Sequence, residues 1–452
     1  MKIPETPPSV EDVLSKTFKE NREKAIEILT RFNPTDLRGQ YHHWGKLKYL
    51  QPPKGFTSEQ WWAGIKTARQ KLYKKLKFVD KHGEPFKFAI PDCVIQDLLW
   101  LERHVAGSIL MDQAIKEPES RNTYLVSSLF DEAINSSQME GAATTYNVAK
   151  EMLREGRDPV DISEQMILNN YRAMNFINEF KDEHLTSEMI KELHRILVED
   201  TLKNPKDAGQ FRTSKDEIVV VDRRDNTVLH NPPDANDLPE RVKRLCQFAN
   251  ENNEKSNIPA PLRAIILHFM LAYDHPFIDG NGRTARALFY WMMAKNGYWM
   301  TRYLSISRVL KKEFGQYKNG FLHVETDDND LTYFFIHQFS VIKKSTIQLN
   351  NYLKEKSHEI ESTKKLLQGK RKFAYKLNYR QLSIIKHALE HPNFTYSIEG
   401  HKNSHGIVYQ TARMDLLTLS EKCGLLKKEK FGKTFIFVSP PDLKKRITKS
   451  LK

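Results

Sequence analysis

The segment from His275 to Arg286, HPFIDGNGRTAR, combines an imidazole, a carboxylate, two glycines around an asparagine, and two guanidiniums. Gly280 and Gly282 permit positive φ and a close backbone approach, so successive amide N–H groups around Asn281 can form a nest for anions. A helix that begins near Asn281 would add its unsatisfied N–H groups and its positive dipole end. These residue types and this spacing suit the binding of a triphosphate.

The charged side chains of the segment fit the same ligand. Arg283 and Arg286 lie three residues apart, so one helix face would carry both towards phosphate oxygens. Asp279 is a hard oxygen ligand suited to Mg²⁺ shared with those oxygens. His275 can accept a proton at neutral pH. A surface turn with solvated arginines would explain each residue singly but not the whole set.

This segment resembles the signature motif of Fic-domain proteins. The resemblance implies a Fic-type helical core and transfer of AMP from ATP to a Ser, Thr or Tyr hydroxyl of a target protein and of the enzyme itself. It implies that His275 is the general base and that Asp279 holds Mg²⁺. The residues that would bind the nucleotide are Gly280, Asn281, Gly282, Arg283 and Arg286.

A second segment, SSQMEG from Ser136 to Gly141, resembles the inhibitory motif of that family. Ser136 and Glu140 are four residues apart, which places them on one face of a helix. In the family the glutamate pairs with the second arginine of the core motif, here Arg286, and blocks productive binding of the γ-phosphate. Because the segment precedes the core motif, the chain resembles the group whose inhibitory helix lies on the N-terminal side.

A third segment predicts a short β-hairpin. The apolar residues Ile218, Val219, Val220 and Val221 precede a polar turn at 222–226 and a second apolar stretch at 227–229. Together with residues 209–212, the hairpin resembles the flap of the family, which positions a target segment by strand addition. We therefore expect it to hold a target hydroxyl near His275.

The elements that must position these residues are expected to be mostly helices. One apolar helix should deliver His275 at its end, and the next should begin after Gly282. The expected helices span residues 10–31, 58–76, 91–117, 121–141, 162–180, 187–200, 238–250, 262–273, 330–367, 379–390 and 408–423.

The sequence predicts a mainly α protein in four parts. These are an N-terminal helical region (1–120), a Fic core with its inhibitory helix (121–345), a helical linker (346–372) and a C-terminal winged helix (373–452). If 408–423 is a recognition helix, Gln410, Thr411 and Arg413 would face a DNA groove. Docking of a protein is an equal alternative.

The bulk composition narrows the class of protein. A net charge of +14, from 71 basic and 57 acidic residues, favours polyanions such as nucleotides or nucleic acid as partners. Three widely spaced cysteines indicate a reducing, cytoplasmic setting. No apolar run approaches the ~20 residues of a membrane span. Homo-oligomerisation stays open.

Three other functions compete with AMP transfer to a protein. One is a DNA-binding regulator whose Fic core senses a nucleotide. Another is a Fic enzyme that removes AMP or transfers a different phosphate-containing group. The third is a metal hydrolase that uses His268, His275 and Asp279.

Overall fold

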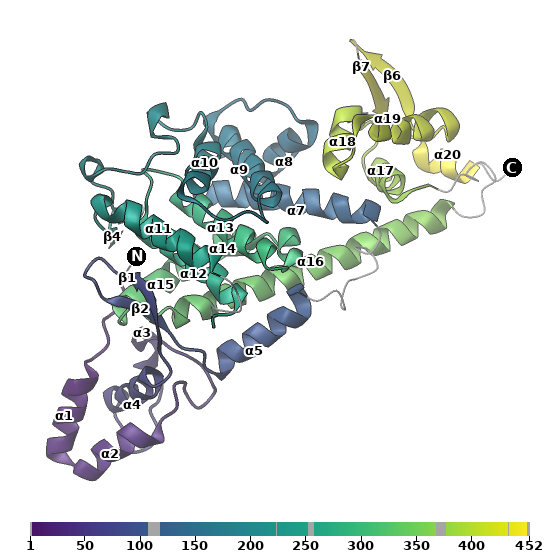
Figure 1. The fold of residues 1–452 in the computed structure, drawn as a ribbon. Helices are drawn as coiled ribbons and strands as arrows, with labels where there is room; N and C mark the ends of the chain where they lie inside the picture. Colours follow the sequence, from purple (N-terminus) through teal and green to yellow (C-terminus); the bar gives the residue numbers. More distant parts are fainter. Residues whose placement is uncertain are drawn as a thin grey trace. The chain divides into compact units, whose positions relative to one another are not determined.

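The computed structural model describes residues 2–106, 118–222, 224–251, 257–367, 377–432 and 434–449. These residues are mainly helical and include three small antiparallel sheets (Figure 1). The expected fold class is therefore confirmed. The chain divides into two compact units, each built from segments that are not continuous in sequence.

The first unit comprises Met1–Ala106, Arg172–Thr301 and Val309–Lys343. Its helices are α1 (Val10–Glu20), α2 (Arg22–Arg31), α3 (Trp44–Leu47), α4 (Ser58–Gln70), α5 (Asp92–Leu101), α10 (Ser187–Val198), α11 (Leu238–Asn250), α12 (Ala260–Asp274), α13 (Asn281–Lys295) and α15 (Phe314–Thr326). Its strands are β1 (Lys74–Val79), β2 (Pro85–Phe88), β3 (Val220–Val221) and β4 (Val228–His230).

The second unit comprises Gly107–Tyr171, Arg302–Arg308 and Lys344–Lys452. Its elements are α7 (Pro118–Met139), α8 (Tyr146–Glu155), α17 (Tyr379–Glu390), β5 (Thr395–Ser397), α18 (Ile398–His405), α19 (Tyr409–Leu417), β6 (Lys427–Phe431), β7 (Thr434–Val438) and α20 (Leu443–Lys449). Three helices contribute residues to both units: α9 (Ile162–Glu179), α14 (Ile306–Lys312) and α16 (Thr332–Leu367).

The antiparallel pair α12 and α13 lies at the centre of the first unit. Almost every residue of both helices is buried, including the large side chains of Phe269, Phe289 and Trp291. A helix that is apolar on all sides must be enclosed by other elements. The loop that joins the two helices is the segment that begins at His275.

The N-terminal region is joined to the rest of the first unit by a buried polar cluster. Lys66 and Arg69 of α4 are almost fully buried. Lys66 pairs with Asp327, and Arg69 donates to the Tyr333 hydroxyl at 2.6 Å. The Tyr41 hydroxyl donates to Asp330 at 2.5 Å. Buried charges persist only when they are paired, so these contacts fix the region onto residues 327–333.

Some expected elements differ from those observed in this region. The helix expected at 10–31 breaks at Asn21, whose extended backbone ends α1 and whose side chain caps α2. The helix expected at 58–76 ends at Gln70, and β1 follows it. The α-helix expected at 91–117 ends at Leu101 and continues as a π-helical turn to Ala106, while 107–117 lie outside the described residues.

In the second unit, α18 packs against both α7 and α8. Thr123 of α7 bonds to Nδ1 of His405 at 2.7 Å, and the Tyr379 hydroxyl donates to that of Tyr124 at 2.9 Å. These contacts group α7 with the C-terminal helices, whereas the expected core 121–345 combined α7 with the catalytic segment. The expected limits at 120, 345 and 372 stay a prediction, and residues 368–372 of the linker lie outside the described chain.

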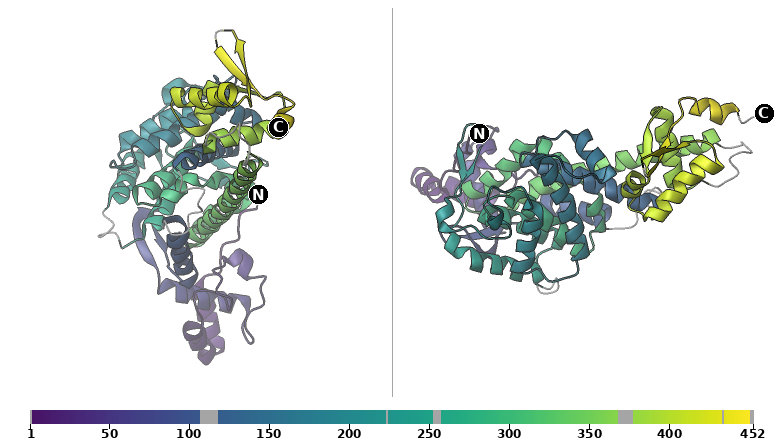
Figure 2. Two further views of the ribbon diagram at one scale, coloured as in Figure 1. Left: turned by 90° about the vertical axis from the view of Figure 1, so that its right-hand side faces the viewer. Right: turned by 90° about the horizontal axis from the view of Figure 1, so that it is seen from above.

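The C-terminal elements follow one another in the order α17, β5, α18, α19, β6, β7 and α20, and the expected winged helix stays a prediction. The strands pair in the order β5-β7-β6, and β6 and β7 project as a ribbon (Figure 2). The helix expected at 408–423 is α19 followed by a π-helical turn at Thr418–Lys422. The sequence did not predict β5, α18 or α20.

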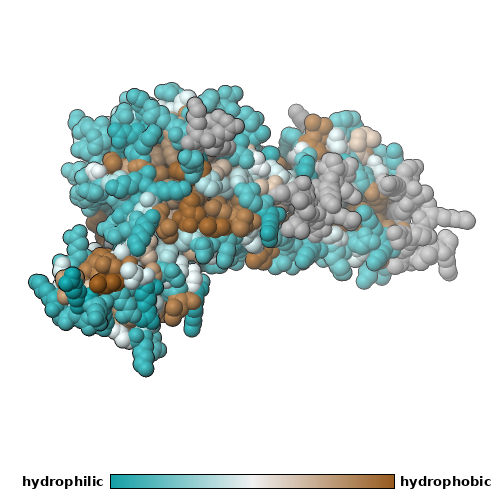
Figure 3. Space-filling view, turned by 60° about the horizontal axis from the view of Figure 1, so that its bottom comes forward, coloured by the Kyte–Doolittle hydropathy of each residue, from teal (hydrophilic) through white to brown (hydrophobic). Residues whose placement is uncertain are grey.

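The surface in Figure 3 is mostly hydrophilic, with separate hydrophobic areas. The exposed apolar side chains include Phe18 of α1 and Ile26 and Leu29 of α2. Within the described ranges, no helix combines the length and the apolar character needed to cross a membrane. The cytoplasmic location stays a prediction.

Candidate active site

His275 is the C-cap of α12 and has a left-handed backbone conformation, with φ 47° and ψ 56°. This conformation is uncommon for a residue with a side chain, and it persists only where neighbouring contacts impose it. The His275 N–H still donates to the Leu271 carbonyl at 3.0 Å, which closes the helix. The backbone then turns sharply, leaving the half-buried imidazole at the start of the loop.

The imidazole of His275 has a defined tautomer if it is neutral. Its Nδ1 lies 3.3 Å from the Ala272 carbonyl oxygen, which can only accept a hydrogen bond. A neutral ring oriented in this way carries its proton on Nδ1 and its lone pair on Nε2. Nε2 is therefore the atom suited to accept a proton.

Asn281 and Gly280 shape the loop between the two helices. The Asn281 side chain accepts from the Phe277 N–H at 2.9 Å and donates to the Phe277 carbonyl at 2.7 Å. Gly280 has φ 81°, and a Cβ there would lie 2.9 Å from Cγ1 of Val198 and 3.3 Å from the His194 ring. Glycine is therefore required at 280, whereas Gly282 lies in the first turn of α13.

The first turn of α13 presents the backbone groups expected to face an anion. Gly280 is its N-cap, and the first helical bond joins the Thr284 N–H to the Gly280 carbonyl at 3.0 Å. The Asp279 carboxylate beside this turn is more than half exposed and accepts from the Gly280 N–H at 2.6 Å. A carboxylate and a helix N-terminus lie together at this position.

The two motif arginines are buried. Nη1 of Arg283 donates to the Leu197 carbonyl at 2.8 Å, and Nη2 lies 3.8 Å from the Asp279 carboxylate. Arg286 is 2% exposed. Burial and then the charge of Arg286 lower the pKa of His268 to about 3. Two cationic groups are thus held beneath the loop, where a low dielectric strengthens their field.

Arg212 binds the backbone of the loop from outside. Its Nε donates to the His275 carbonyl at 2.8 Å, and its Nη2 donates to the carbonyls of Pro233 and Asp274 at 2.6 and 3.3 Å. Its own N–H donates to the Pro276 carbonyl at 2.8 Å. A rigid guanidinium fork that spans several carbonyls fixes the direction of the backbone on both sides of the imidazole.

His194 of α10 holds the other end of the loop. The Gly209 N–H donates to its Nδ1 at 3.0 Å, so its proton lies on Nε2, which donates to the Asp279 carbonyl at 2.9 Å. Its ring stacks on Phe277, with ring centroids 3.7 Å apart. Burial lowers the pKa of His194 to about 4, which keeps this neutral tautomer at pH 7.

The two-stranded sheet of β3 and β4 is shorter than the sequence predicts. Ile218 and Val219 precede β3, which contains only Val220 and Val221. Its register shifts between Val220↔His230 and Val221↔Val228. At the end of β4, Nε2 of His230 bonds to the Tyr273 carbonyl at 2.8 Å, and so the sheet is attached to the end of α12.

The residues of the expected inhibitory motif belong to the second unit. Ser136 is buried within α7, while Glu140 is half-buried and lies one residue beyond the end of that helix. Gly141 has φ 109°, and the N–H of Ala142 donates to the Ser137 carbonyl at 3.0 Å. Ser136 and Glu140 are thus separated by the last helical turn.

The described residues contain no cluster of three or more His, Cys, Asp or Glu side chains that could hold a metal ion. His268 is fully buried, and its Nε2 bonds to the Tyr317 hydroxyl at 2.8 Å. The metal hydrolase alternative, which needs His268 as a ligand, is therefore disfavoured. A Mg²⁺ ion that is held largely by phosphate oxygens needs only one or two protein carboxylates, and Asp279 fits that requirement.

In this helical protein, a buried helix ends in a left-handed histidine and is followed by a glycine N-cap and buried arginines. Residues 184–293, which include α12, α13 and the loop between them, match the model of the Fic/DOC family. The chain is similar in fold to a Fic family protein from Desulfovibrio desulfuricans G20. That match has a TM-score of 0.50 and 14% identity, and it covers 80% of this chain and 98% of the other.

Several sequence relatives bear the name "Protein adenylyltransferase Fic", among them one from Nematostella vectensis and one from Drosophila grimshawi. The one from Nematostella vectensis is 29% identical over 196 residues, which are 43% of this chain and 42% of that protein. The one from Drosophila grimshawi is 33% identical over 175 residues, covering 37% and 34%. The chain therefore spans less than half the length of these relatives.

Proposed function

We propose that this protein transfers AMP from Mg²⁺-bound ATP to a Ser, Thr or Tyr hydroxyl of a target protein and of itself. The observation that carries the proposal is the loop between α12 and α13, which joins the imidazole of His275 to the first turn of α13. The names of the relatives support AMP transfer as the reaction class.

In the proposed reaction, Nε2 of His275 accepts the proton of the target hydroxyl. The oxygen forms a bond to the α-phosphorus, the bond between that phosphorus and the bridging oxygen breaks, and pyrophosphate leaves. Asp279 would hold Mg²⁺, which neutralises phosphate charge when bound. Arg283, Arg286 and the first amides of α13 would bind the phosphates, so catalysis rests on positioning and charge.

The second part of the proposal is that Glu140 inhibits this reaction by pairing with Arg286. Glu140 directly follows α7, and the buried Ser136 and Ser137 fix that helix end. The Ser137 hydroxyl donates to the Met166 carbonyl of α9 at 3.1 Å. A carboxylate at the end of a firmly packed helix is well suited to a fixed inhibitory contact.

The proposal is tested by incubating Glu140→Gly protein with α-³²P-labelled ATP and Mg²⁺. We expect label on the protein itself and on a target in a lysate, at a higher rate than for the wild type. His275→Ala in the same background should abolish the label. Absence of any label from Glu140→Gly protein would contradict AMP transfer, whereas equal rates for both would contradict only the inhibitory role.

The sheet of β3 and β4 supports a role in target positioning. Val219 is 47% exposed and directly precedes β3. We expect Val219→Pro, which removes one backbone donor, to weaken labelling of the target while ATP binding is kept. Val219→Thr is the matched control. Loss of ATP binding in Val219→Pro would show a structural role instead.

The C-terminal elements are proposed to form a winged helix that docks a partner. The ribbon of β6 exposes Lys427, Lys428 and Lys430, which suit a nucleic acid. In contrast, α19 exposes Tyr409 and Met414, which suit a protein. A mobility-shift assay with duplex DNA over a range of salt concentrations separates the two partners.

A further inference from the structure

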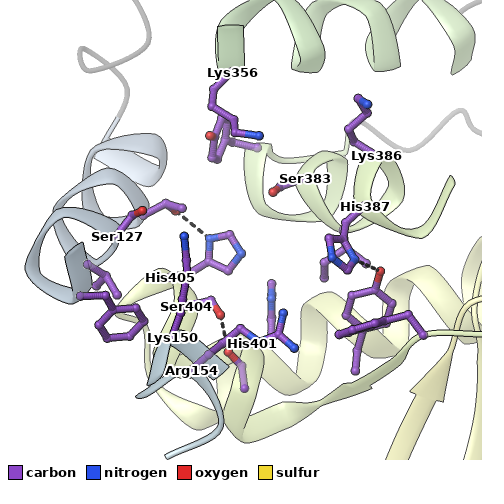
Figure 4. Close-up of a pocket in the computed structure, with 18 of the residues that line it drawn as sticks. Ser127, Lys150, Arg154, Lys356, Ser383, Lys386, His387, His401, Ser404 and His405 are labelled. Carbon is purple, nitrogen blue, oxygen red and sulfur yellow. Dashed lines mark hydrogen bonds between the residues drawn. The ribbon is translucent and has the colours of Figure 1, made fainter. Parts of the chain in front are cut away.

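A cavity in the second unit is not used by the proposed reaction (Figure 4). Its volume is about 520 Å³, within the ~300–1,000 Å³ typical of pockets for small molecules. Its walls come from α7, α8, α16, α17, β5 and α18. Residues from the predicted inhibitory helix and from the C-terminal elements therefore meet around one space.

One wall of the cavity carries positive charge. Lys150 and Arg154 line it from successive turns of α8. Within the described chain, no carboxylate lies within 4.0 Å of the Lys150 ammonium group, which donates to the Tyr146 hydroxyl at 3.3 Å. The Arg154 guanidinium pairs with Glu151 and lies 5.0 Å from the centroid of the Phe394 ring.

The acidic residues of the lining are already engaged with neighbouring groups. Glu359 accepts from Lys356 at 2.7 Å, and Glu390 pairs with Lys386. Burial raises the pKa of Glu151, the charge of Arg154 lowers it, and the neighbouring Glu155 raises it further. Among the described residues, Lys150 is therefore the basic side chain of this wall without a carboxylate partner, and Arg154, one turn further along α8, adds a second cation whose charge Glu151 partly offsets.

The pKa of His387 reflects the positive charge around the cavity. Its Nδ1 bonds to the Tyr396 hydroxyl at 2.7 Å. Its pKa is lowered to about 4, first by burial and then by the charges of His391, Arg154 and Lys356, against the opposing charge of Glu390. The imidazole is thus neutral at pH 7, and the surrounding charges oppose a further positive one.

The rest of the lining is largely aromatic or bears hydroxyl groups, with a few aliphatic side chains such as Val126, Ile360 and Ile384. Ring faces can hold a flat ligand, and hydroxyls can donate to an anionic oxygen. The aromatic side chains are those of Phe130, Tyr352, Tyr379, Phe394 and Tyr396, and the hydroxyls include those of Ser127, Ser383 and Ser404. The lining therefore combines ring contacts with anion contacts.

We propose that this cavity binds a small molecule in which an aromatic ring carries a phosphate or carboxylate group, and that the bound molecule holds α7 in place. The anionic group would lie against Lys150 and Arg154, and the ring would lie among the tyrosines. Since Glu140 directly follows the last residue of α7, occupancy would strengthen inhibition. Only this last consequence rests on the proposed function.

Binding is measured by isothermal titration with probes that do not resemble ATP. The probes are phenyl phosphate, benzoate, inorganic phosphate and phenol, added to the full-length chain. We expect phenyl phosphate or benzoate to bind more tightly than phenol or inorganic phosphate. The stronger of the two identifies the anionic group, and phenol binding as tightly as both would overturn the proposal.

Lys150→Gln and Arg154→Gln, made separately, should each weaken binding of the preferred probe about tenfold, since each removes one charge-assisted contact. Lys150 has no ion pair within the described residues, so its variant should keep the wild-type melting temperature. The matched control is Lys243→Gln/Arg244→Gln, on an exposed face of α11. Unchanged affinity in both cavity variants would overturn the proposed site.

The effect on α7 is measured by amide hydrogen exchange. With probe at ten times its Kd, exchange across residues 120–139 should slow by up to about tenfold, because opening must first release the ligand. Labelling by the wild type should fall in parallel, while that of Glu140→Gly should not. Slowed exchange without any labelling activity would support the binding site and contradict only AMP transfer. Unchanged exchange would contradict the proposal that the bound molecule holds α7 in place.

Discussion

At the scale of residues, the geometry of the loop depends on side chains that bind its backbone. Arg212 contacts three carbonyls around His275, and His194 binds the carbonyl of Asp279. These hydrogen bonds all go to backbone carbonyls, while the His194 ring also stacks on the side chain of Phe277. The motif thus supplies the groups suited to chemistry, and distant residues fix their directions.

We predict that Arg212→Met lowers both stability and labelling. The loss of charge-assisted bonds to buried carbonyls should cost about 2–5 kcal/mol of the free energy of unfolding. A misplaced imidazole should also slow labelling about a hundredfold in the Glu140→Gly background. Urea unfolding and the labelling assay measure the two effects.

Arg195→Met is the control, because Arg195 lies on the surface of α10 and pairs only with exposed carboxylates. Such pairs contribute about 0–1 kcal/mol. Should Arg212→Met unfold at the same urea concentration as the control, Arg212 does not support the loop as described.

The motif residues could be identified from the sequence because they form a short continuous pattern of unusual composition. Arg212 was noted only as part of the segment before the hairpin, and His194 was not noted. Their partners in the loop are backbone carbonyls more than sixty residues away, and a carbonyl, which every residue has, cannot be recognised from a pattern of side chains. Only the folded chain brings these groups together.

At the scale of elements, the junction between α12 and α13 depends on a glycine in a confined space. Gly280 and Gly297 share nearly the same φ, 81° and 82°. A Cβ at 297 would meet no atom within 4 Å, whereas a Cβ at 280 would approach Val198 and His194. Alanine substitutions at the two positions therefore distinguish the effect of backbone strain from that of steric crowding.

We predict that Gly297→Ala costs about 1–2 kcal/mol, as expected for left-handed backbone strain alone. Gly280→Ala should cost about 1–3 kcal/mol more because of overpacking, and it should abolish labelling. Denaturant unfolding of both variants gives the difference. Equal losses of stability would contradict a steric requirement at 280.

The predicted bounds are most accurate for helices whose apolar residues recur with a strong helical period. The bounds of α11 and α17 agree with the expected 238–250 and 379–390. In contrast, no glycine or proline separates α4 from β1. The lysines of β1 also obscure the alternation of apolar and polar residues that is typical of a strand. Asn, Ser and Gly weaken the helical pattern of α18, which is held by the Ser397 cap, by Gly406 and by packing on α7 and α8.

At the scale of the whole molecule, several buried histidines are neutral in the fold. Burial is the largest cause in each case, and it lowers the pKa of His43 and His268 to about 3 and that of His194, His323 and His387 to about 4. Unfolded histidines titrate near about 6.5. Between these values, protons therefore bind the unfolded chain in preference to the folded one.

We predict that stability is full above pH 6.5 and falls as the pH is lowered towards 4. Each such histidine should contribute up to about 1.4 kcal/mol per pH unit within that window. Urea midpoints from pH 7.5 to 4.5 measure the slope. His268→Phe should flatten it, whereas His82→Gln, at an exposed turn, should leave it unchanged; a wild-type midpoint that does not vary with pH would contradict the account.

The interleaved course of the chain also affects the order in which the protein can fold during synthesis. Lys66 pairs with Asp327 and Asp328, and Nη1 of Arg69 donates to Tyr333, whereas its other nitrogens donate to the nearby carbonyls of Pro34 and His42. A nascent chain must therefore keep these charged groups hydrated until residues beyond 333 have left the ribosome. The N-terminal helices cannot complete their packing until most of the chain has been synthesised. The first unit is therefore completed late in translation.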